Sequence, residues 1–249
     1  MTPPQRTIDL NADLGEHPNS NLDEQIMPFI SSCNIACGGH IGDEVSVRNT
    51  VRLAKQHGVA IGAHPSYPDP ENFGRKIMEM QPKDLAESIT NQIMLVQRIC
   101  EEEDVKMHHV KPHGALYNHA AADEFISQLI YEVLREIAPD IYWMGLAHSV
   151  SEKIALKNGH PFIAEGFADR QYELDGSLRS RSMEGAVLTA NQVIEQVEEL
   201  AMNQRVKAEK WLGLKVQSIC LHGDTAGAVS LAKEINQHLA AKGIQIAAV

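Results

Sequence analysis

The sequence predicts an α/β protein, a single barrel of seven parallel strands with intervening helices, of the TIM-barrel kind. Strand-like and helix-like segments alternate seven times along the chain, which implies a parallel sheet with crossover helices. Polar residues also gather directly after the strand segments, and 249 residues is an ordinary length for one barrel. We therefore expect one domain over residues 1–249.

Seven short runs rich in apolar residues are expected to form the strands. They cover residues 7–13, 29–36, 59–63, 105–110, 141–146, 161–164 and 216–221. The run at 141–146 is nearly all apolar, as expected for a strand that is covered on both faces of a parallel sheet. The last residues, 244–249, are also apolar and are expected to pack against the rest of the chain.

The helix between the second and third strands is marked at both ends. Asp43 is a good N-cap for a helix over residues 44–57, and Gly58 is typical of the position just past a helix end. Pro82 suits the first turn of the next helix, which is expected to reach residue 103. Further helices are expected over residues 123–137, in a short segment that stops at Gly159, over residues 189–211, and in a last segment that reaches residue 242.

The positions of the polar residues favour a closed barrel over an open doubly wound sheet. In an open sheet, ligands collect at one switch point that is served by few strands, whereas in a barrel all carboxyl ends surround one mouth. Here polar residues follow six of the seven predicted strands: Asp13 and Glu16, His40, His64, Lys111 and His113, Glu165 and Asp169, and His222 and Asp224.

Composition and motifs exclude several classes of function. Lys and Arg number 22 against 33 Asp and Glu, a net charge of −11 that argues against non-specific binding of nucleic acid. No apolar run approaches the ~20 residues that cross a bilayer, and no apolar signal region opens the chain. The four cysteines lack zinc-ribbon spacing and are expected to be reduced thiols of a cytoplasmic protein. The phosphate loop of P-loop ATPases, the Gly-x-Gly-x-x-Gly fingerprint and the Gly-x-Ser-x-Gly elbow are all missing from the sequence.

The segment 110–118, Val-Lys-Pro-His-Gly-Ala-Leu-Tyr-Asn, carries the densest chemistry of the chain. It is expected to be a strand that ends in a loop, where rigid strands commonly present functional groups. The ammonium of Lys111 could bind a carboxylate or a developing oxyanion at the mouth. Arg75, beside a glycine in another loop, could likewise hold an anionic ligand.

Imidazoles and carboxylates at the strand ends offer two kinds of chemistry. His40, His64, His113 and His222 could act as acid–base groups or bind a divalent metal. Asp13 could be a base or a metal ligand, and Glu165 a general acid or base. Asp169 and Arg170 could act directly or form an ion pair that holds their loop. The other histidines considered, at 57, 108, 119, 160 and 238, are expected to be structural or surface groups.

Long motifs along the whole chain resemble the LamB/YcsF family. They lie at residues 8–16, 34–40, 62–69, 110–118, 167–170 and 220–224. The resemblance implies a seven-stranded variant of the TIM barrel that is related to polysaccharide-deacetylase-like barrels. It also implies the role of the A subunit in the prokaryotic 5-oxoprolinase, which works with two other subunits, B and C. That complex opens 5-oxo-L-proline to L-glutamate with hydrolysis of ATP.

The strand-end residues suit such a reaction, because a phosphorylated lactam would be open to attack by water. Asp13, Lys111, His113 and Glu165 are the candidate catalytic residues: Lys111 and His113 would bind the substrate carboxylate or the activated oxygen, and Asp13 or Glu165 would orient water. The candidate substrate-binding residues are Glu16, His40, His64, Arg75, Tyr117, Asn118, Asp169, Arg170, His222 and Asp224.

Two other functions remain open from the sequence. One is a metal-dependent deacetylase or amide hydrolase that acts alone on a carbohydrate or lactam, with Asp13, His40 and His64 as ligands of the metal. The other is a binding subunit without catalysis, which delivers its ligand to a partner enzyme. Whether a divalent metal is needed, and which subunit binds ATP, are not decided by the residues alone.

Overall fold

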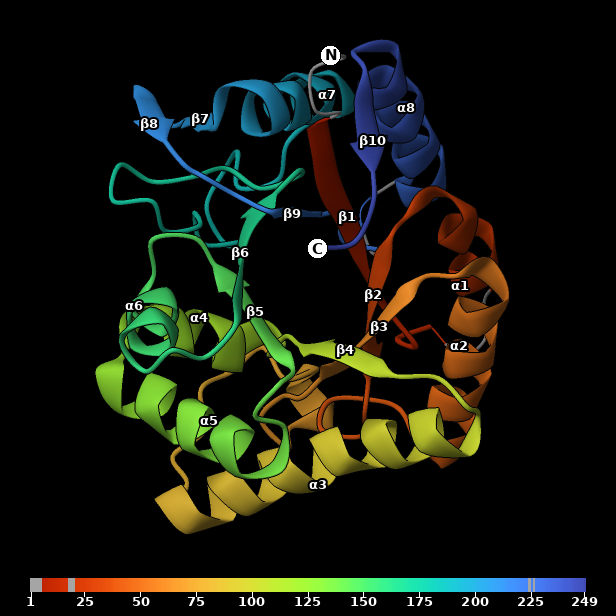
Figure 1. Cartoon of the computed structure of the whole chain (residues 1–249). Coiled ribbons are helices and arrows are strands. Elements are labelled where there is room, and N and C mark those ends of the chain that lie inside the picture. The colour runs from red at the N-terminus through yellow and green to blue at the C-terminus, as the bar shows by residue number, and fades with distance from the viewer. Residues whose placement is uncertain (1–5, 18–20, 224, 226) are drawn as a thin grey trace.

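The computed structural model describes residues 6–17, 21–223, 225 and 227–249 (Figure 1). Seven parallel strands close into a barrel in this part of the chain. They are β1 (Arg6–Leu14), β2 (Ser32–Ala36), β3 (Ala60–His64), β4 (Met107–Val110), β5 (Tyr142–Leu146), β6 (Phe162–Phe167) and β9 (Ser218–Cys220). They are hydrogen-bonded in that order, and β9 returns to β1 through the pairs from Asp9↔Ser218 to Asn11↔Cys220. The predicted closed barrel is therefore confirmed.

Helices surround the barrel on the outside (Figure 1). They are α1 (Leu22–Ile26), α2 (Glu44–His57), α3 (Pro82–Glu102), α4 (Gly114–Ala122), α5 (Glu124–Ile137), α6 (Val150–Lys157), α7 (Ala190–Glu198) and α8 (Ala228–Ala241). Three short helical segments accompany them: η1 (Met27–Phe29), η2 (Pro70–Asn72) and the π-helical η3 (Glu199–Asn203). None of the helices among the described residues combines the length and the apolar character that a membrane crossing requires.

The helix α2 has the limits that its sequence predicts. Asp43 accepts a hydrogen bond from the backbone N–H of Ser46 at 2.8 Å, and the Ser46 hydroxyl accepts one from the Asp43 N–H. Gly58 ends the helix in the left-handed conformation, at φ 67°. Local capping chemistry therefore sets both ends of α2, independently of its contacts with the barrel.

Residues 189–211 do not form one helix, contrary to the expectation. The apolar residues Val193, Val197 and Leu200 are buried at helical spacing, but the helix ends near the last of them. The chain then turns through Gln204 at φ 51° into an antiparallel hairpin of β7 (Arg205–Lys207) and β8 (Trp211–Gly213). Beyond Leu200 the helical spacing of apolar residues stops, so nothing would hold a longer helix on the barrel.

Three further elements differ from their predicted limits. Part of the predicted loop at 110–118 is helical, because α4 starts at Gly114 and buries Ala115, Leu116 and Ala120. The strand predicted at 161–164 continues to Phe167, which places Glu165 inside β6. The last part of the chain forms β10 (Ile244–Ile246), which pairs in parallel with the first residues of β1.

The inside of the barrel is unusually polar. Along β1, Asp9, Asn11 and Asp13 alternate with apolar residues that belong to the hydrophobic core, and all of them are buried. Successive side chains of a strand point to opposite faces, so the three polar residues share the inner face. Asp13 lies at the mouth, and Asp9 accepts hydrogen bonds from three serine hydroxyls, those of Ser31, Ser32 and Ser218.

Candidate active site at the barrel mouth

Lys111, at the end of β4, is the centre of the site. Its side chain is 2% exposed, and its ammonium nitrogen lies 2.8 Å from Glu165 Oε1. The same nitrogen lies 3.1 Å from Asp13 Oδ1 and 3.1 Å from Asn11 Oδ1. Cys220 Sγ is also 3.1 Å away. A buried ammonium is stable only when it is paired in this way, since its desolvation is costly.

The charges of this cluster reinforce one another. Burial alone would lower the pKa of Lys111, but the charge of Asp13 and those of its other acidic neighbours raise it well above its ordinary value. Burial alone would raise the pKa of Asp13, but the charges of His64 and Lys111 lower it well below its ordinary value. Lys111 and Asp13 are therefore an ion pair at neutral pH.

Both carboxylate oxygens of Glu165 accept hydrogen bonds. Oε1 accepts hydrogen bonds from Lys111 and, at 2.8 Å, from Asn11 Nδ2. Oε2 accepts one from the phenol of Tyr117 at 2.7 Å. Burial and the neighbouring Glu165 raise the pKa of Tyr117 well above its ordinary value, so its proton stays in this bond. Glu165 is 0% exposed and lies behind the residues that line the mouth.

His64 and His113 are linked, and their partners fix their protonation. His113 Nε2 lies 3.0 Å from the carbonyl of Phe73, so this nitrogen donates. Burial, followed by the charge of His64, lowers the pKa of His113 to about 3, so the ring is neutral and Nδ1 accepts. His64 Nε2 is 3.0 Å from that Nδ1, and His64 Nδ1 is 2.7 Å from the carbonyl of Lys111. Both nitrogens of His64 therefore donate, which makes it an imidazolium.

Asp13 explains how His64 keeps this charge. The Asp13 carboxylate lies 3.5 Å from His64 Nε2. Burial alone would lower the pKa of His64, but the Asp13 charge and hydrogen bond raise it above its ordinary value. The mouth thus contains two buried cations, Lys111 and His64, both near Oδ1 of the Asp13 carboxylate.

His40 extends the cluster toward the rim. Its ring stacks on that of His113, with centroids 3.7 Å apart, and its Nε2 lies 2.9 Å from Glu16 Oε1. Its Nδ1 lies 3.1 Å from the hydroxyl of Ser66. Burial, followed by the charge of His64, lowers the pKa of His40 to about 3. His40 is neutral and fully engaged, and it does not line the cavity.

A second pair of residues lies at the ends of β6 and β9, next to Asp13. His222, after β9, places its Nδ1 2.8 Å from Asp169 Oδ1, after β6. The hydroxyl of Thr225 donates to the same carboxylate, and the imidazole stacks on Phe167 with centroids 5.3 Å apart. Burial alone would raise the pKa of Asp169, but His222 lowers it below its ordinary value, so Asp169 is ionised. Asp224, also predicted for the site, lies outside the described residues.

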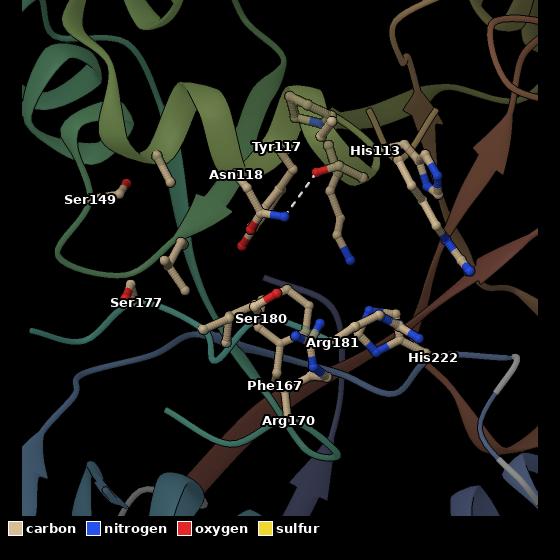
Figure 2. A pocket seen from close by; sticks show the side chains of 18 of the residues that line it. His113, Tyr117, Asn118, Ser149, Phe167, Arg170, Ser177, Ser180, Arg181 and His222 are labelled. Atoms are coloured by element: carbon tan, nitrogen blue, oxygen red, sulfur yellow. Dashed lines mark hydrogen bonds between the residues drawn. The ribbon is translucent and has the colours of Figure 1, made fainter. Parts of the chain in front are cut away.

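The two groups face one cavity of about 640 Å³ (Figure 2). Its lining includes most of the predicted residues: Asp13, Glu16, His64, Arg75, Lys111, His113, Tyr117, Asn118, Arg170 and His222. Arg170 is buried and donates to the carbonyls of Ala186 and Arg179, so it ties down the loop that follows β6. The same loop brings Ser177, Ser180 and Arg181 to the cavity.

The polar layer beneath Lys111 was not predicted. Asn34 donates to Asn11 Oδ1 and Asp13 Oδ1, each at 2.8 Å, and its own Oδ1 lies 2.7 Å from His109 Nε2. These residues lie within strands, whereas the predicted site residues follow strand ends. Polar residues at every second position of β1 were the available sign that the barrel interior is hydrophilic.

Three groups of side chains among the described residues could hold a metal ion. They are Asp13, Cys220 and His222; Asp13, His64 and His113; and Glu16, His40 and His113. The expected set of Asp13, His40 and His64 is not one of them, because His40 turns toward Glu16 and Ser66. The Lys111 ammonium already lies on Asp13 Oδ1 and would repel a dication there. The group of Glu16, His40 and His113 has the ligand types that zinc and manganese accept, two neutral imidazoles and a carboxylate. The imidazolium of His64 lies 3.0 Å from His113 Nδ1, so a dication there would require His64 to lose its proton.

Comparisons with known proteins agree with the family and the fold that the sequence predicts. The model of the LamB/YcsF family matches residues 8–249. The 5-oxoprolinase A subunit of Shouchella clausii is 41% identical over 247 residues, which cover 97% of this chain and 98% of that protein. The lactam utilization protein of Thermus thermophilus has 32% identity and a TM-score of 0.91, over 98% of this chain and 100% of that one. A peptidoglycan deacetylase of Bacillus subtilis, at 12% identity and a TM-score of 0.50, covers 100% of this chain and 90% of its own and shares the fold alone.

Proposed function

The chain belongs to the LamB/YcsF family, as its motifs predicted, and we propose that it is the A subunit of an ATP-dependent 5-oxoprolinase. The relative from Shouchella clausii bears that name, and the Thermus protein is named for lactam utilization, so both support a role in opening a cyclic amide. In the proposed reaction, 5-oxo-L-proline becomes L-glutamate while ATP is hydrolysed to ADP and phosphate.

The observation that carries the proposal is the buried ammonium of Lys111 beside the cavity. An amide carbon accepts water only when negative charge on its oxygen is stabilised, and a fixed cation in a site of low dielectric does this well. Asp13 and Glu165 keep Lys111 charged and in place. Removing one such donor typically costs about 10²- to 10³-fold in kcat.

The roles within the cluster follow from which groups reach the cavity. Lys111 and the imidazolium of His64 line it, and their positive charges would face the substrate carboxylate or the activated oxygen. Both N–H groups of His64 stay with the Lys111 carbonyl and His113, so His64 would act through its charge. Asp13 also lines it and is the carboxylate placed to orient water. Glu165 lies behind the lining, so in this mechanism it acts on Lys111 and Tyr117 and not on the substrate. His113, engaged through both nitrogens, holds His64 in its charged state.

ATP and partner subunits enter the proposal for a chemical reason. A lactam is resonance-stabilised, and phosphorylation of its oxygen would make the ring carbon electrophilic. The relative is named as one lettered subunit of its enzyme, which supports an assembly with further subunits. We propose that these are two, B and C, with ATP as co-substrate of the complex. The four cysteines are buried free thiols, as suits a protein of the reducing cytoplasm.

The test is glutamate release from 5-oxo-L-proline, measured with and without ATP, for the chain alone and mixed with its partner subunits. We expect glutamate only from the complete mixture with ATP. Intact 5-oxo-L-proline in every mixture would refute the proposal, provided that each subunit is folded and the partners associate with the chain.

A second function, metal-dependent amide hydrolysis by the chain alone, is favoured by one observation. The donor atoms of Glu16, His40 and His113 all lie within 4.8 Å of one another, as ligands of one ion would. A metal there would polarise an amide carbonyl. Stoichiometric zinc or manganese in the purified chain, together with hydrolysis that needs no ATP, would favour this function over the first.

A further inference from the structure

We infer that Asp169 and His222 are the proton-transfer pair of ring opening, with His222 Nε2 as the atom that exchanges a proton with the reacting groups. The inference rests on the proposed function and names a catalytic group for it. Water and the ring nitrogen both need such a group: one must lose a proton as it attacks, and the other must gain one as it leaves.

The hydrogen bonds of the mouth point to His222. His40, His64 and His113 use both of their ring nitrogens in hydrogen bonds or ion pairs. Asp13 Oδ1 already accepts from Asn34 and Lys111. Among the four strand-end imidazoles, those of His40, His64, His113 and His222, Nε2 of His222 is the one ring nitrogen for which the structure records no hydrogen bond within the described residues. His148 also lines the cavity, but it is exposed and no carboxylate of the described chain is recorded on its ring to set its tautomer.

Asp169 sets the tautomer that this role requires. Its ionised carboxylate lies 2.8 Å from His222 Nδ1 and accepts that proton, so in the neutral ring the lone pair is on Nε2. The Thr225 hydroxyl holds the carboxylate, and Phe167 packs flat against the imidazole, at an interplanar angle of 20°. An acid that orients an imidazole, which in turn faces a reacting group, is the arrangement that general base catalysis needs.

The position of His222 also suits the chemistry. Its side chain is 16% exposed and lines the cavity (Figure 2). A ring nitrogen lies within 4.8 Å of the Asp13 carboxylate, and the Lys111 ammonium is 5.5 Å from the centre of the Phe167 ring on which His222 stacks. The lactam oxygen can therefore meet Lys111 while the ring nitrogen faces His222.

The proton balance of the step is simple. As the oxygen of water bonds to the ring carbon of the phosphorylated lactam, one proton of that water passes to His222 Nε2, and the imidazolium is stabilised by Asp169. The ring C–N bond then breaks with its electron pair on nitrogen, and that nitrogen takes the proton from Nε2. The oxygen of the former water becomes the carbonyl of an acyl phosphate as its remaining proton passes to the amine. A second water hydrolyses the acyl phosphate to a carboxylate and inorganic phosphate, and His222 ends neutral.

The experiment uses the complete complex and glutamate release from 5-oxo-L-proline. For His222→Ala we expect kcat to fall by about 10²- to 10⁴-fold with little change in KM, and added imidazole to restore part of the activity. Asp169→Asn is expected to lower kcat by up to about 10⁴-fold, because without the carboxylate the His222 ring favours the tautomer with its proton on Nε2. The control is His238→Gln, which alters a surface histidine paired with Glu198 and is expected to keep the wild-type rate.

A substrate in which oxygen replaces the ring nitrogen separates catalysis from structure. The C–O bond of this lactone breaks with less protonation of its leaving atom than the C–N bond of the lactam requires. We therefore expect the fall in kcat for His222→Ala to be smaller with the lactone than with the lactam. An unchanged kcat in His222→Ala would overturn the inference, and so would an equal loss on both substrates without rescue by imidazole. A wild-type complex that releases no glutamate would instead refute the proposed function.

Discussion

The two sides of the barrel mouth differ in how their polar groups are used. On the side of β1 to β4 the groups are bonded to one another and buried: Asp13, Glu16, His40, His64, Lys111 and His113. On the side of β6 and β9, His222 keeps one ring nitrogen toward the cavity, and the loop after β6 brings exposed Ser180 and Arg181 to it. The first side supplies fixed charge, and the second can exchange protons and contact a ligand.

This division predicts different penalties for mutation. A buried cluster of paired charges is costly to damage, because removal of one partner leaves the others without compensation in a medium of low dielectric. An exposed group such as Arg181 can be replaced with a smaller loss of stability, since water solvates what remains. Variants on the first side should therefore change stability and rate together, whereas variants at the exposed loop residues of the second side should change function alone.

The largest effect is expected for Lys111→Met. The substitution leaves the carboxylates of Asp13 and Glu165 buried without their shared cation, which typically costs about 3–5 kcal/mol of stability. Glutamate release should fall by at least about 10²-fold. The control is Lys106→Met, an exposed residue just before β4. Urea unfolding measures the first effect, and a Lys111→Met protein as stable as the control would contradict the assignment of fixed charge.

The next effect tests the layer beneath Lys111. A Cβ atom at Gly62 would lie 2.2 Å from His109 Nε2, so Gly62→Ala must displace the imidazole that holds Asn34. We expect a loss of about 1–3 kcal/mol, the cost of a buried polar group without its partner, and a lower kcat. Gly213→Ala is the matched control, because a Cβ atom there meets nothing within 4 Å.

Equal stability of the two alanine variants, measured by urea unfolding, would show that His109 can shift without cost. A loss of stability with an unchanged kcat would show instead that the lower layer supports the fold but does not position Asn34, Asn11 and Asp13 for catalysis.

Much of this arrangement could be predicted from sequence, because it depends on local chemistry. The cap at Asp43 and the stop at Gly58 set the limits of α2, and the polar strand ends indicated which residues would approach the mouth. Barrel closure could be inferred because only a closed sheet brings so many strand ends to one place.

What could not be predicted depends on contacts between distant segments. The sequence does not say that His40 turns to Glu16 while His64 turns to Asp13, nor which ring nitrogen of His222 meets Asp169. These hydrogen-bond partners are determined by the register of β-strands that are far apart in the chain. The hairpin of β7 and β8 was missed because the polar–apolar alternation of Arg205–Glu209 is short and directly follows a helical pattern.

A smaller effect concerns the pH dependence of stability on the first side. His40 and His113 have folded pKa values of about 3, against 6.5 for an ordinary histidine. Between these values the unfolded chain binds more protons, so stability falls as the pH falls, by up to about 1.4 kcal/mol per pH unit for each histidine. His64 has a raised pKa and adds stability that is fully present below pH 6.5 and is lost as the pH rises through its folded pKa.

Urea unfolding at about pH 6.5 and about pH 5 measures how the free energy of unfolding changes with pH. The variant His40→Gln should lose the part of this change that one histidine contributes. His238→Gln, at the surface, should keep the whole change. A stability that does not change over this interval would mean that the buried imidazoles already carry protons, and the hydrogen-bond assignment at His113 would then be wrong.

The smallest effect is expected at the exposed edge of the second side. Arg181 lines the cavity from the loop after β6, but its side chain is exposed, so water and salt weaken its field. For Arg181→Ala we expect KM for 5-oxo-L-proline to rise by less than about tenfold, with kcat and stability unchanged. Arg135→Ala, on the outer face of α5, is the control for loss of a surface charge. A drop in kcat as large as that of Lys111→Met would place Arg181 among the fixed charges and remove the distinction between the two sides.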